Sequence, residues 1–222
     1  MKEKEGNNML YYLPGCGTNR NHTAAGRKMV DYMKSRGAKL AKCCKLDVDY
    51  YRPGDTVVQN CTQCSFMLRE RCPQITVTSL YEFVLGDPGF RWADLGGRRM
   101  TLQDCFRMRG DAAFHDAVRQ CLRRLRVSVV ETEENRADAK FCGVWLNEPA
   151  DPRCAAVAPK SFKALEAYRH ILSEEEKEAA MRAWVNRYTT EDTVVYCNGC
   201  EKGLRLGGGK PTHLLELLAA GY

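Results

Sequence analysis

Cysteine is the residue type of this chain with the most evident chemical use, since 12 of its 222 residues are cysteines. Most of them fall at corresponding positions of two similar stretches of sequence. The first set has five members and the second has four: Cys16, Cys43, Cys44, Cys61 and Cys64, then Cys105, Cys142, Cys197 and Cys200. Each set ends in a Cys-x-x-Cys, a spacing that lets two sulfurs turn onto one metal centre.

Thiolate is a soft ligand that favours zinc, copper(I) and iron–sulfur clusters. Four thiolates complete a tetrahedral zinc site or a cubane [4Fe-4S] cluster. The first set has five cysteines, one more than these sites need. Either the set binds an unusual cluster, or one of its cysteines is a spare redox thiol. The second set has four cysteines, because Phe141 stands at the position that corresponds to Cys43 of the first set. Ligand count alone leaves zinc, a cubane cluster and an altered cluster open there.

Three further cysteines have no counterpart in the other half of the chain: Cys72, Cys121 and Cys154. We interpret them as small apolar residues of the core, a common environment for unligated cysteine. Arg107 and Arg109 follow Cys105 and carry donors that can bind a carboxylate, but a surface position is more common for arginine. We expect His213 to begin a helix and bond the backbone there, and not to act as a ligand.

Repeated sequences predict the elements that carry the two sets. Asp55-Thr-Val-Val and Asp192-Thr-Val-Val each precede a Cys-x-x-Cys and predict equivalent strands. Leu80-Tyr-Glu-Phe and Leu214-Leu-Glu-Leu predict equivalent helices. The repeat therefore predicts an α/β fold of two tandem, pseudo-symmetric units with mostly parallel sheets. Loops at the carboxyl ends of parallel strands converge, so we expect each cysteine set to gather in one crevice.

The two units are expected to cover residues 1–90 and 91–222. The second carries a helical insertion over residues 155–190, because 54 residues lie between Cys-x-x-Cys and the preceding cysteine of the set, against 16 in the first unit. Ser173 and Glu176 have the spacing of a capping box that opens a helix within it. We expect the insertion to pack against the second unit or to cover its site.

Composition excludes several classes of protein. The 34 basic and 28 acidic residues are spread along the chain, so no concentrated patch predicts a nucleic-acid partner. No apolar run approaches the roughly 20 residues of a transmembrane helix, and the N-terminus lacks the apolar stretch of a signal peptide. We therefore expect a cytoplasmic protein, and in a reducing compartment this many cysteines indicates metal or redox chemistry.

The order Pro14-Gly15-Cys16, Cys43-Cys44, Cys61-x-x-Cys64 and a leucine-containing helix, given twice, resembles the cysteine-rich CCG-domain family. That family includes the B subunit of heterodisulfide reductase and iron–sulfur subunits of glycolate, lactate, glycerol-3-phosphate and succinate oxidoreductases. The resemblance covers Leu10 to Gly221. Lys45 replaces the glycine of the first CCG, and Phe141 replaces the first cysteine of the second.

The resemblance implies a subunit of a multi-component oxidoreductase that transfers electrons or reduces a disulfide. It implies iron–sulfur clusters, among them a non-cubane [4Fe-4S] cluster on Cys16, Cys43, Cys44, Cys61 and Cys64. For Cys105, Cys142, Cys197 and Cys200, where Phe141 replaces a thiol, the ligand count makes a cubane cluster or zinc the expected centre. The first set is the favoured reacting centre, and no single catalytic residue is identified. A flavoprotein or ferredoxin-like subunit is implied as the electron donor, with a disulfide as a candidate substrate.

Two other functions remain open at this point. In one, both sets bind zinc and the protein is a structural or interaction module. In the other, the protein is a metal-free dithiol oxidoreductase that exchanges thiols through Cys61 and Cys64 or through Cys197 and Cys200.

Overall fold

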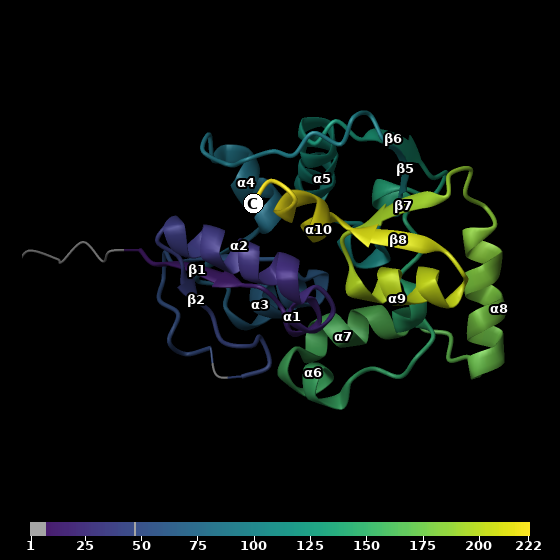
Figure 1. Cartoon of the computed structure of the whole chain (residues 1–222). Helices are drawn as coiled ribbons and strands as arrows, with labels where there is room; N and C mark the ends of the chain where they lie inside the picture. Colours follow the sequence, from purple (N-terminus) through teal and green to yellow (C-terminus); the bar gives the residue numbers. More distant parts are fainter. Residues whose placement is uncertain (1–7, 47) are drawn as a thin grey trace, which may run out of the picture.

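Two four-stranded sheets, each entirely parallel, form the framework of the protein (Figure 1). The arrangement comes from a computed structural model that describes residues 8–46 and 48–222. The first sheet has the order β2-β1-β3-β4, with β1 (Leu10–Leu13), β2 (Lys39–Leu40), β3 (Thr56–Gln59) and β4 (Thr76–Ser79). The second has the order β6-β5-β7-β8, with β5 (Arg99–Leu102), β6 (Ser128–Glu131), β7 (Asp192–Val195) and β8 (Lys210–His213).

The two sheets have the same strand order once β5 is matched to β1, β6 to β2, β7 to β3 and β8 to β4. Both repeated tetrapeptides supply an inner strand, where Val58 pairs with Tyr12 and Val194 pairs with Leu102. Inner strands of parallel sheets are covered on both faces, which accounts for their adjacent buried valines. The predicted α/β fold with two tandem units is confirmed.

Helices follow the strands in the same order in both units. The first unit has α1 (Cys16–Asn21), α2 (Thr23–Ser35), α3 (Thr62–Arg71) and α4 (Leu80–Gly86). The second has α5 (Ala112–Arg124), α9 (Asn198–Leu206), α10 (Leu214–Ala219) and the short 3-10 helices η1 (Phe106–Met108), η2 (Arg136–Asp138) and η3 (Gly143–Leu146). The repeated helices α4 and α10 both open with a capping box, formed by Ser79 with Glu82 and by His213 with Glu216.

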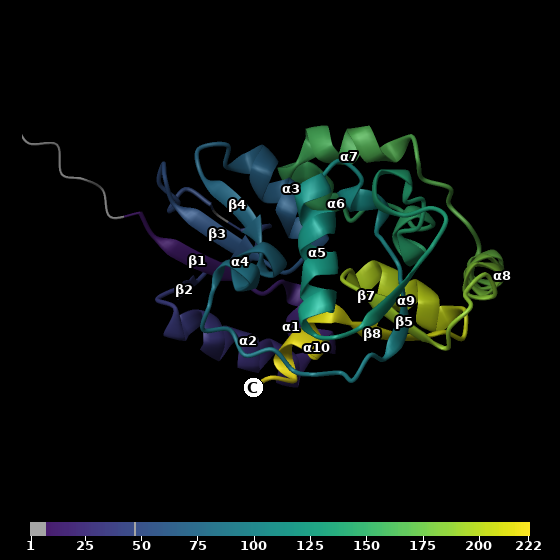
Figure 2. The same cartoon turned by 90° about the horizontal axis from the view of Figure 1, so that it is seen from above.

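The units are joined by reciprocal contacts of their helices. Helix α4 of the first unit packs on α5 of the second, and α10 of the second packs on α2 of the first (Figure 2). One hydrophobic core runs through both units and includes Met29 and Val118. Buried His22 adds polar contacts across this interface, with Nε2 2.8 Å from Glu201 Oε2 and Nδ1 3.1 Å from Glu216 Oε1. The units therefore share their interior.

The insertion forms three helices and contacts both units, whereas the sequence predicted contact with the second alone. It begins at Pro152, three residues before the predicted start, and consists of α6 (Pro152–Val157), α7 (Pro159–Glu166) and α8 (Glu174–Val185). Helix α8 opens with the predicted capping box and packs on α9, but α6 and α7 pack on α3 of the first unit. The Glu70 carboxylate of α3 accepts the backbone N–H groups of Lys160 and Ser161 at 3.0 and 2.7 Å. The insertion thus bridges the two units.

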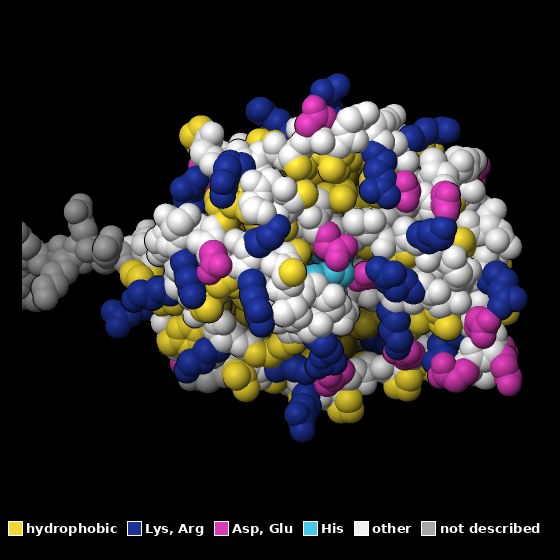
Figure 3. Space-filling view, in the orientation of Figure 1, with side chains coloured by type: hydrophobic (Ala, Val, Ile, Leu, Met, Phe, Trp, Pro, Cys, Tyr) yellow, Lys and Arg dark blue, Asp and Glu magenta, His cyan; other side chains and the backbone are white. Residues whose placement is uncertain are grey.

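The surface mixes charges of both signs. On the face seen in Figure 3, lysine and arginine side chains are scattered among acidic, apolar and uncharged ones. Within residues 8–46 and 48–222, no helix combines the length and the apolar character needed to cross a bilayer.

Candidate metal centres

Both cysteine sets lie at the carboxyl ends of their parallel strands, as the repeat predicts. Cys16 opens α1 just after β1, Cys61 immediately precedes α3, and Cys197 immediately precedes α9. Because β3 and β7 are equivalent strands, Cys61 and Cys197 occupy equivalent turns. The tight strand-to-helix connections bring residues that are far apart in sequence to one edge of each sheet.

The second set is compact and buried. Its four sulfurs lie within 4.8 Å of one another, and the Sγ atoms of Cys105 and Cys142 are 3.4 Å apart. No more than 2 % of any of the four residues is exposed. These thiols, supplied by Cys105, Cys142, Cys197 and Cys200, could hold a metal ion.

A glycine makes this compact arrangement feasible. Gly143 has a φ of +54°, and a Cβ atom at this position would lie 1.9 Å from the backbone oxygen of Gly199, between the two cysteines of the Cys-x-x-Cys. Any side chain would therefore push Cys142 away from the other three cysteines of the set. This contact explains the Cys-Gly sequence of the second set.

Phe141 places an aromatic ring at the position where the first set has the thiol of Cys43. Its ring stacks on Trp184 of α8, with centroids 4.8 Å apart and planes at 26°. Phe141 is only 3 % exposed. The insertion thus covers the position at which the first set has Cys43. Beside these rings, a cavity of about 490 Å³ reaches Cys142 from the side of the insertion.

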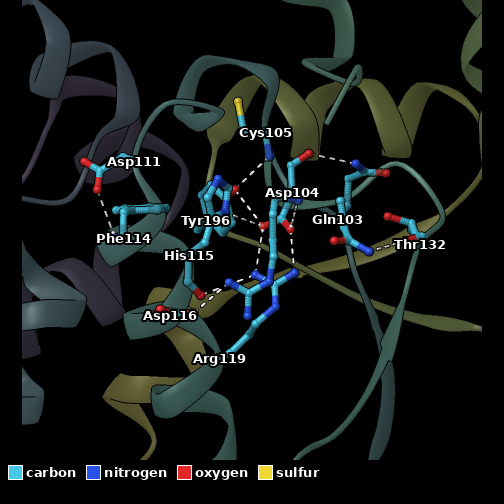
Figure 4. A network of polar contacts seen from close by, with 12 residues as sticks. Gln103, Asp104, Cys105, Asp111, Phe114, His115, Asp116, Arg119, Thr132 and Tyr196 are labelled. Carbon is cyan, nitrogen blue, oxygen red and sulfur yellow. Dashed lines mark hydrogen bonds and ion pairs between the residues drawn. The ribbon is translucent and has the colours of Figure 1, made fainter. Parts of the chain in front are cut away.

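A buried network of charged and polar side chains lies next to Cys105 of the second set (Figure 4). Asp104 is fully buried and accepts hydrogen bonds from Arg119 at 2.6 Å and from the Tyr196 hydroxyl at 2.9 Å. His115 Nδ1 lies 3.2 Å from the same carboxylate. The Tyr196 hydroxyl in turn accepts the backbone N–H of Cys105 at 2.8 Å. The network fixes the backbone of Cys105, while its sulfur points away from these groups in Figure 4.

The first set surrounds an open cavity. Two pairs of sulfurs are in close contact, Cys16 with Cys43 and Cys44 with Cys64, each at 3.3 Å. Cys16 is exposed and Cys61 is partly exposed. All five cysteines of the set line a cavity of about 210 Å³, together with Gly17, Lys45, Thr62, Gln63, Arg107, Trp145, Cys154, Asn198 and Gly199. Solvent and small molecules therefore have access to this set.

The Pro-Gly-Cys turn has its own steric reason. Gly15 has a φ of +84°, and a Cβ atom there would lie 2.9 Å from the Cβ of Cys61. Only glycine lets the chain turn so closely against the Cys-x-x-Cys. The turn brings Cys16 to the mouth of the cavity.

Each set contains a thiol whose pKa is lowered. A hydrogen bond from Cys64 and, more weakly, the positive charge of Arg107 lower the pKa of Cys61 to about 6, against the effect of burial. Hydrogen bonds from the other three thiols of its set, followed by the charge of Arg107, hold the pKa of Cys197 well below its usual value. Burial and hydrogen bonds raise the pKa of other members of the sets, among them Cys16, Cys64, Cys105 and Cys200. Ligation requires thiolate, so a cation that binds either set would have to displace protons from these thiols.

Arg107 lies between the two sets, although a surface position was expected from the sequence because most arginines are exposed. Its Nη2 donates to the sulfur of Cys197 at 2.9 Å, and its Nη1 donates to Gln63 Oε1 at 3.2 Å. The guanidinium also stacks on Trp145, 4.8 Å from the ring centroid. The only sequence signal was its place two residues after Cys105. Arg109, by contrast, stacks on Phe106 outside the cavity of the first set.

The three unmatched cysteines are all buried, but they differ in surroundings. Cys72 packs in an apolar cluster, and Cys121 donates its S–H to the backbone oxygen of Tyr81. Both fit the expected role in the core. Cys154 is 1 % exposed as well, yet it lines the cavity of the first set. Sequence reasoning missed this placement because α6 is far from the first set along the chain.

His213 begins α10 and is fully buried, as expected of a residue that bonds the backbone. Its Nδ1 accepts the backbone N–H of Leu215 at 3.2 Å. Its ring lies beside that of His22, with centroids 4.6 Å apart. It belongs to the interface between the units.

Comparison with known proteins assigns no family. No protein-family model matches the chain, and no curated protein matches it either. The function must therefore be inferred from the two cysteine sets themselves.

Proposed function

We propose that the protein is a metal-dependent redox component in which the two cysteine sets hold different centres. The first set binds an iron–sulfur cluster and is the reacting centre. The second binds a single tetrahedral ion, with zinc as the favoured metal. The observation that carries this proposal is an accessible cavity lined by five cysteines beside a buried group of four.

The spacing of the second set fits one metal ion. Metal–sulfur bonds of about 2.3 Å in a tetrahedron separate the sulfurs by about 3.8 Å. The four sulfurs already lie within 4.8 Å of one another in a buried site. A cubane cluster places four irons between its cysteines and requires a wider spacing. The compact, buried geometry, with Phe141 and Trp184 stacked beside it, supports a structural site.

The first set fits a larger group. Five thiols exceed what a tetrahedral ion binds, and they surround a cavity instead of closing on one point. This supports a cluster of several irons. The resemblance to the CCG-domain family further supports a non-cubane [4Fe-4S] type. Such a cluster, when bound, supplies one-electron chemistry at an accessible iron.

The charges that line the cavity favour binding of an anionic sulfur compound. Lys45 and Arg107 contribute positive charge to the lining, which includes no carboxylate. Cys16 keeps the mouth open to solvent. Reduction of a disulfide consumes two electrons and two protons and gives two thiols. A partner, a flavoprotein or ferredoxin-like protein, would supply the electrons, so we infer a component of a multi-component oxidoreductase.

Anaerobic purification followed by assay of iron, acid-labile sulfide and zinc tests this assignment. We expect iron and sulfide together with about one zinc per chain. Cys64→Ser should remove iron and sulfide and leave zinc, whereas Cys200→Ser should remove zinc. Zinc at both sets with no sulfide would instead establish the structural zinc protein.

One observation favours the metal-free dithiol function as a second candidate. The pKa of Cys61, lowered to about 6 chiefly by the hydrogen bond from Cys64, gives a thiolate at neutral pH within a Cys-x-x-Cys. This function predicts thiol–disulfide exchange by colourless, metal-free protein. It also predicts that exchange survives Cys16→Ser, because only Cys61 and Cys64 are needed.

A further inference from the structure

The helical insertion delivers a sixth thiol to the cavity of the first set. Cys154 lies in α6 and lines the same cavity as the five cysteines of that set. It is 1 % exposed to solvent and therefore faces the interior of the site. A cavity otherwise formed mainly by the first unit thus includes a sulfur from the insertion of the second.

The sulfur of Cys154 accepts a hydrogen bond. Gln63, which lies inside the Cys-x-x-Cys of the first set, directs its side-chain Nε2 at this sulfur over 3.0 Å. The orientation of the Gln63 amide is fixed by Arg107, since a guanidinium can only donate and its Nη1 faces Gln63 Oε1. The amide N–H is therefore left to face Cys154.

Comparison with Cys121 shows why this contact matters. Cys121 donates its S–H to the backbone oxygen of Tyr81, which is what a protonated thiol does in a core. Cys154 instead receives an N–H group at its sulfur, as a metal-bound sulfur does. Burial and the Asp151 carboxylate raise the pKa of the unligated thiol to about 11, so a bound cation would be needed to hold it as thiolate. Charges of both signs lie near Cys154, because Lys45 of the cavity pairs with Asp151 at the start of α6, with 3.4 Å between Nζ and Oδ2.

The same contacts link the two sets. Arg107 donates to Cys197 of the second set at 2.9 Å and to Gln63, and Gln63 donates to Cys154. The position of α6 is held in addition by α7, whose N-terminal backbone bonds Glu70 of α3. The insertion is therefore fixed in the place where its cysteine meets the cavity.

We propose that Cys154 is a ligand of the metal centre held by the first set, so that residues of both units build that centre. This inference rests on the proposed function, in that it requires a metal centre in the first cavity. Six thiols then surround the cavity, and docking of the insertion is coupled to metal binding. The hydrogen bond from Gln63 orients the ligand and moderates its charge.

The test compares Cys154→Ser with Cys72→Ser in anaerobically purified full-length protein. Cys72 is a matched control because it is equally buried, at 1 %, and does not line the cavity. We expect Cys72→Ser to keep the visible absorption and electron paramagnetic resonance spectra of the wild type. Cys154→Ser should change both spectra and release iron to a chelator faster by about tenfold or more.

The outcomes separate the two proposals. If the wild type contains iron and sulfide that depend on Cys64, but Cys154→Ser matches Cys72→Ser in spectra and in iron release, the ligand role of Cys154 is refuted and the proposed function stands. If Cys64→Ser leaves the metal content of the wild type unchanged, the proposed function fails and the inference fails with it.

A second measurement does not depend on the folding of a variant. Crystals of the anaerobic wild-type holoprotein, measured at the iron absorption edge, would locate the irons directly. Iron within bonding distance of the Cys154 sulfur supports the proposal. Irons bound only by Cys16, Cys43, Cys44, Cys61 and Cys64 overturn it.

Discussion

The two cysteine sets occupy equivalent places in equivalent sheets, yet one is buried and the other is open to solvent. In the second, four sulfurs within 4.8 Å of one another are almost fully buried. In the first, five sulfurs line a cavity of about 210 Å³, and Cys16 is exposed. The comparison teaches that the repeated fold determines where the thiols gather, while a few local residues determine whether the thiols are buried or accessible.

Two substitutions account for most of this difference. Phe141 takes the place of Cys43 and stacks under Trp184 of the insertion, which covers this part of the second set. Asp104 takes the place of Gly15 before the first cysteine and anchors a buried charge network. The first unit has instead a glycine turn that leaves space at the mouth of its cavity.

The largest effect is expected from removing one ligand of each set. Cys200→Ser should lose the metal of the second set and lower the free energy of unfolding by several kcal/mol, because structural zinc contributes about 10 kcal/mol or more in small zinc domains. Cys64→Ser, at an equivalent position, should lose the metal of the first set with a smaller loss of stability. Metal analysis and urea denaturation measure both effects. Equal destabilisation by the two variants would remove the distinction between a structural and a reactive set.

The charge network behind the second set should contribute the next largest effect. Asp104→Asn removes one of the two carboxylate partners of Arg119. Breaking a buried pair costs about 3–5 kcal/mol when the remaining charge has no partner, and because Arg119 keeps Glu131 we expect a loss at or below the lower end of that range. Urea denaturation at pH 7 measures the loss. Asp94→Asn is the control, since Asp94 pairs with Arg126 at the surface and should have little effect. A stability loss for Asp104→Asn no greater than that of the control would show that the network does not support the second unit.

The N-terminal caps of the repeated helices α4 and α10 differ, because His213 of α10 can be protonated and Ser79 of α4 cannot. Burial, followed by the charge of His22, lowers the pKa of His213 to about 4, against about 6.5 in an unfolded chain. Between these values the unfolded chain takes up a proton and the folded protein does not. The free energy of unfolding should therefore fall as the pH drops, by about 2 kcal/mol at pH 5 from this residue.

His213→Asn tests this because it keeps a capping side chain and removes the titration. Ser79, the equivalent cap of α4, has no such titration. Denaturation of the wild type and the variant at pH 7 and pH 5 should show the larger acid loss in the wild type. Parallel losses in the two proteins would mean that His213 does not titrate as proposed.

The smallest effect concerns the charge shared by both sets. In metal-free protein, Arg107→Gln should move the pH midpoint of Cys61 alkylation upward from about 6, because a positive charge that stabilises the thiolate is removed. The hydrogen bond from Cys64 remains, so the shift should be partial. Mass spectrometry of alkylated peptides gives the midpoint, and Arg109→Gln should leave it unchanged. If the midpoint is the same in Arg107→Gln as in the wild type, Arg107 does not lower the pKa of Cys61.

The sequence by itself determined the α/β fold and the placement of the cysteines after equivalent strands. Asp55-Thr-Val-Val and Asp192-Thr-Val-Val form β3 and β7 in matching positions. The capping box of Ser173 and Glu176 opens α8 as predicted. These features depend on short-range patterns of apolar, capping and turn residues, which adjacent positions in the chain specify.

Only the tertiary structure decided which set is open and which other residues reach it. Arg107 and Cys154 had no sequence pattern that distinguished them from surface and core residues. Their roles depend on contacts with Gln63, from which they are 44 and 91 positions distant. The order of residues fixes the local path of the chain, but such long-range contacts arise from the packing of the two units and the insertion against each other.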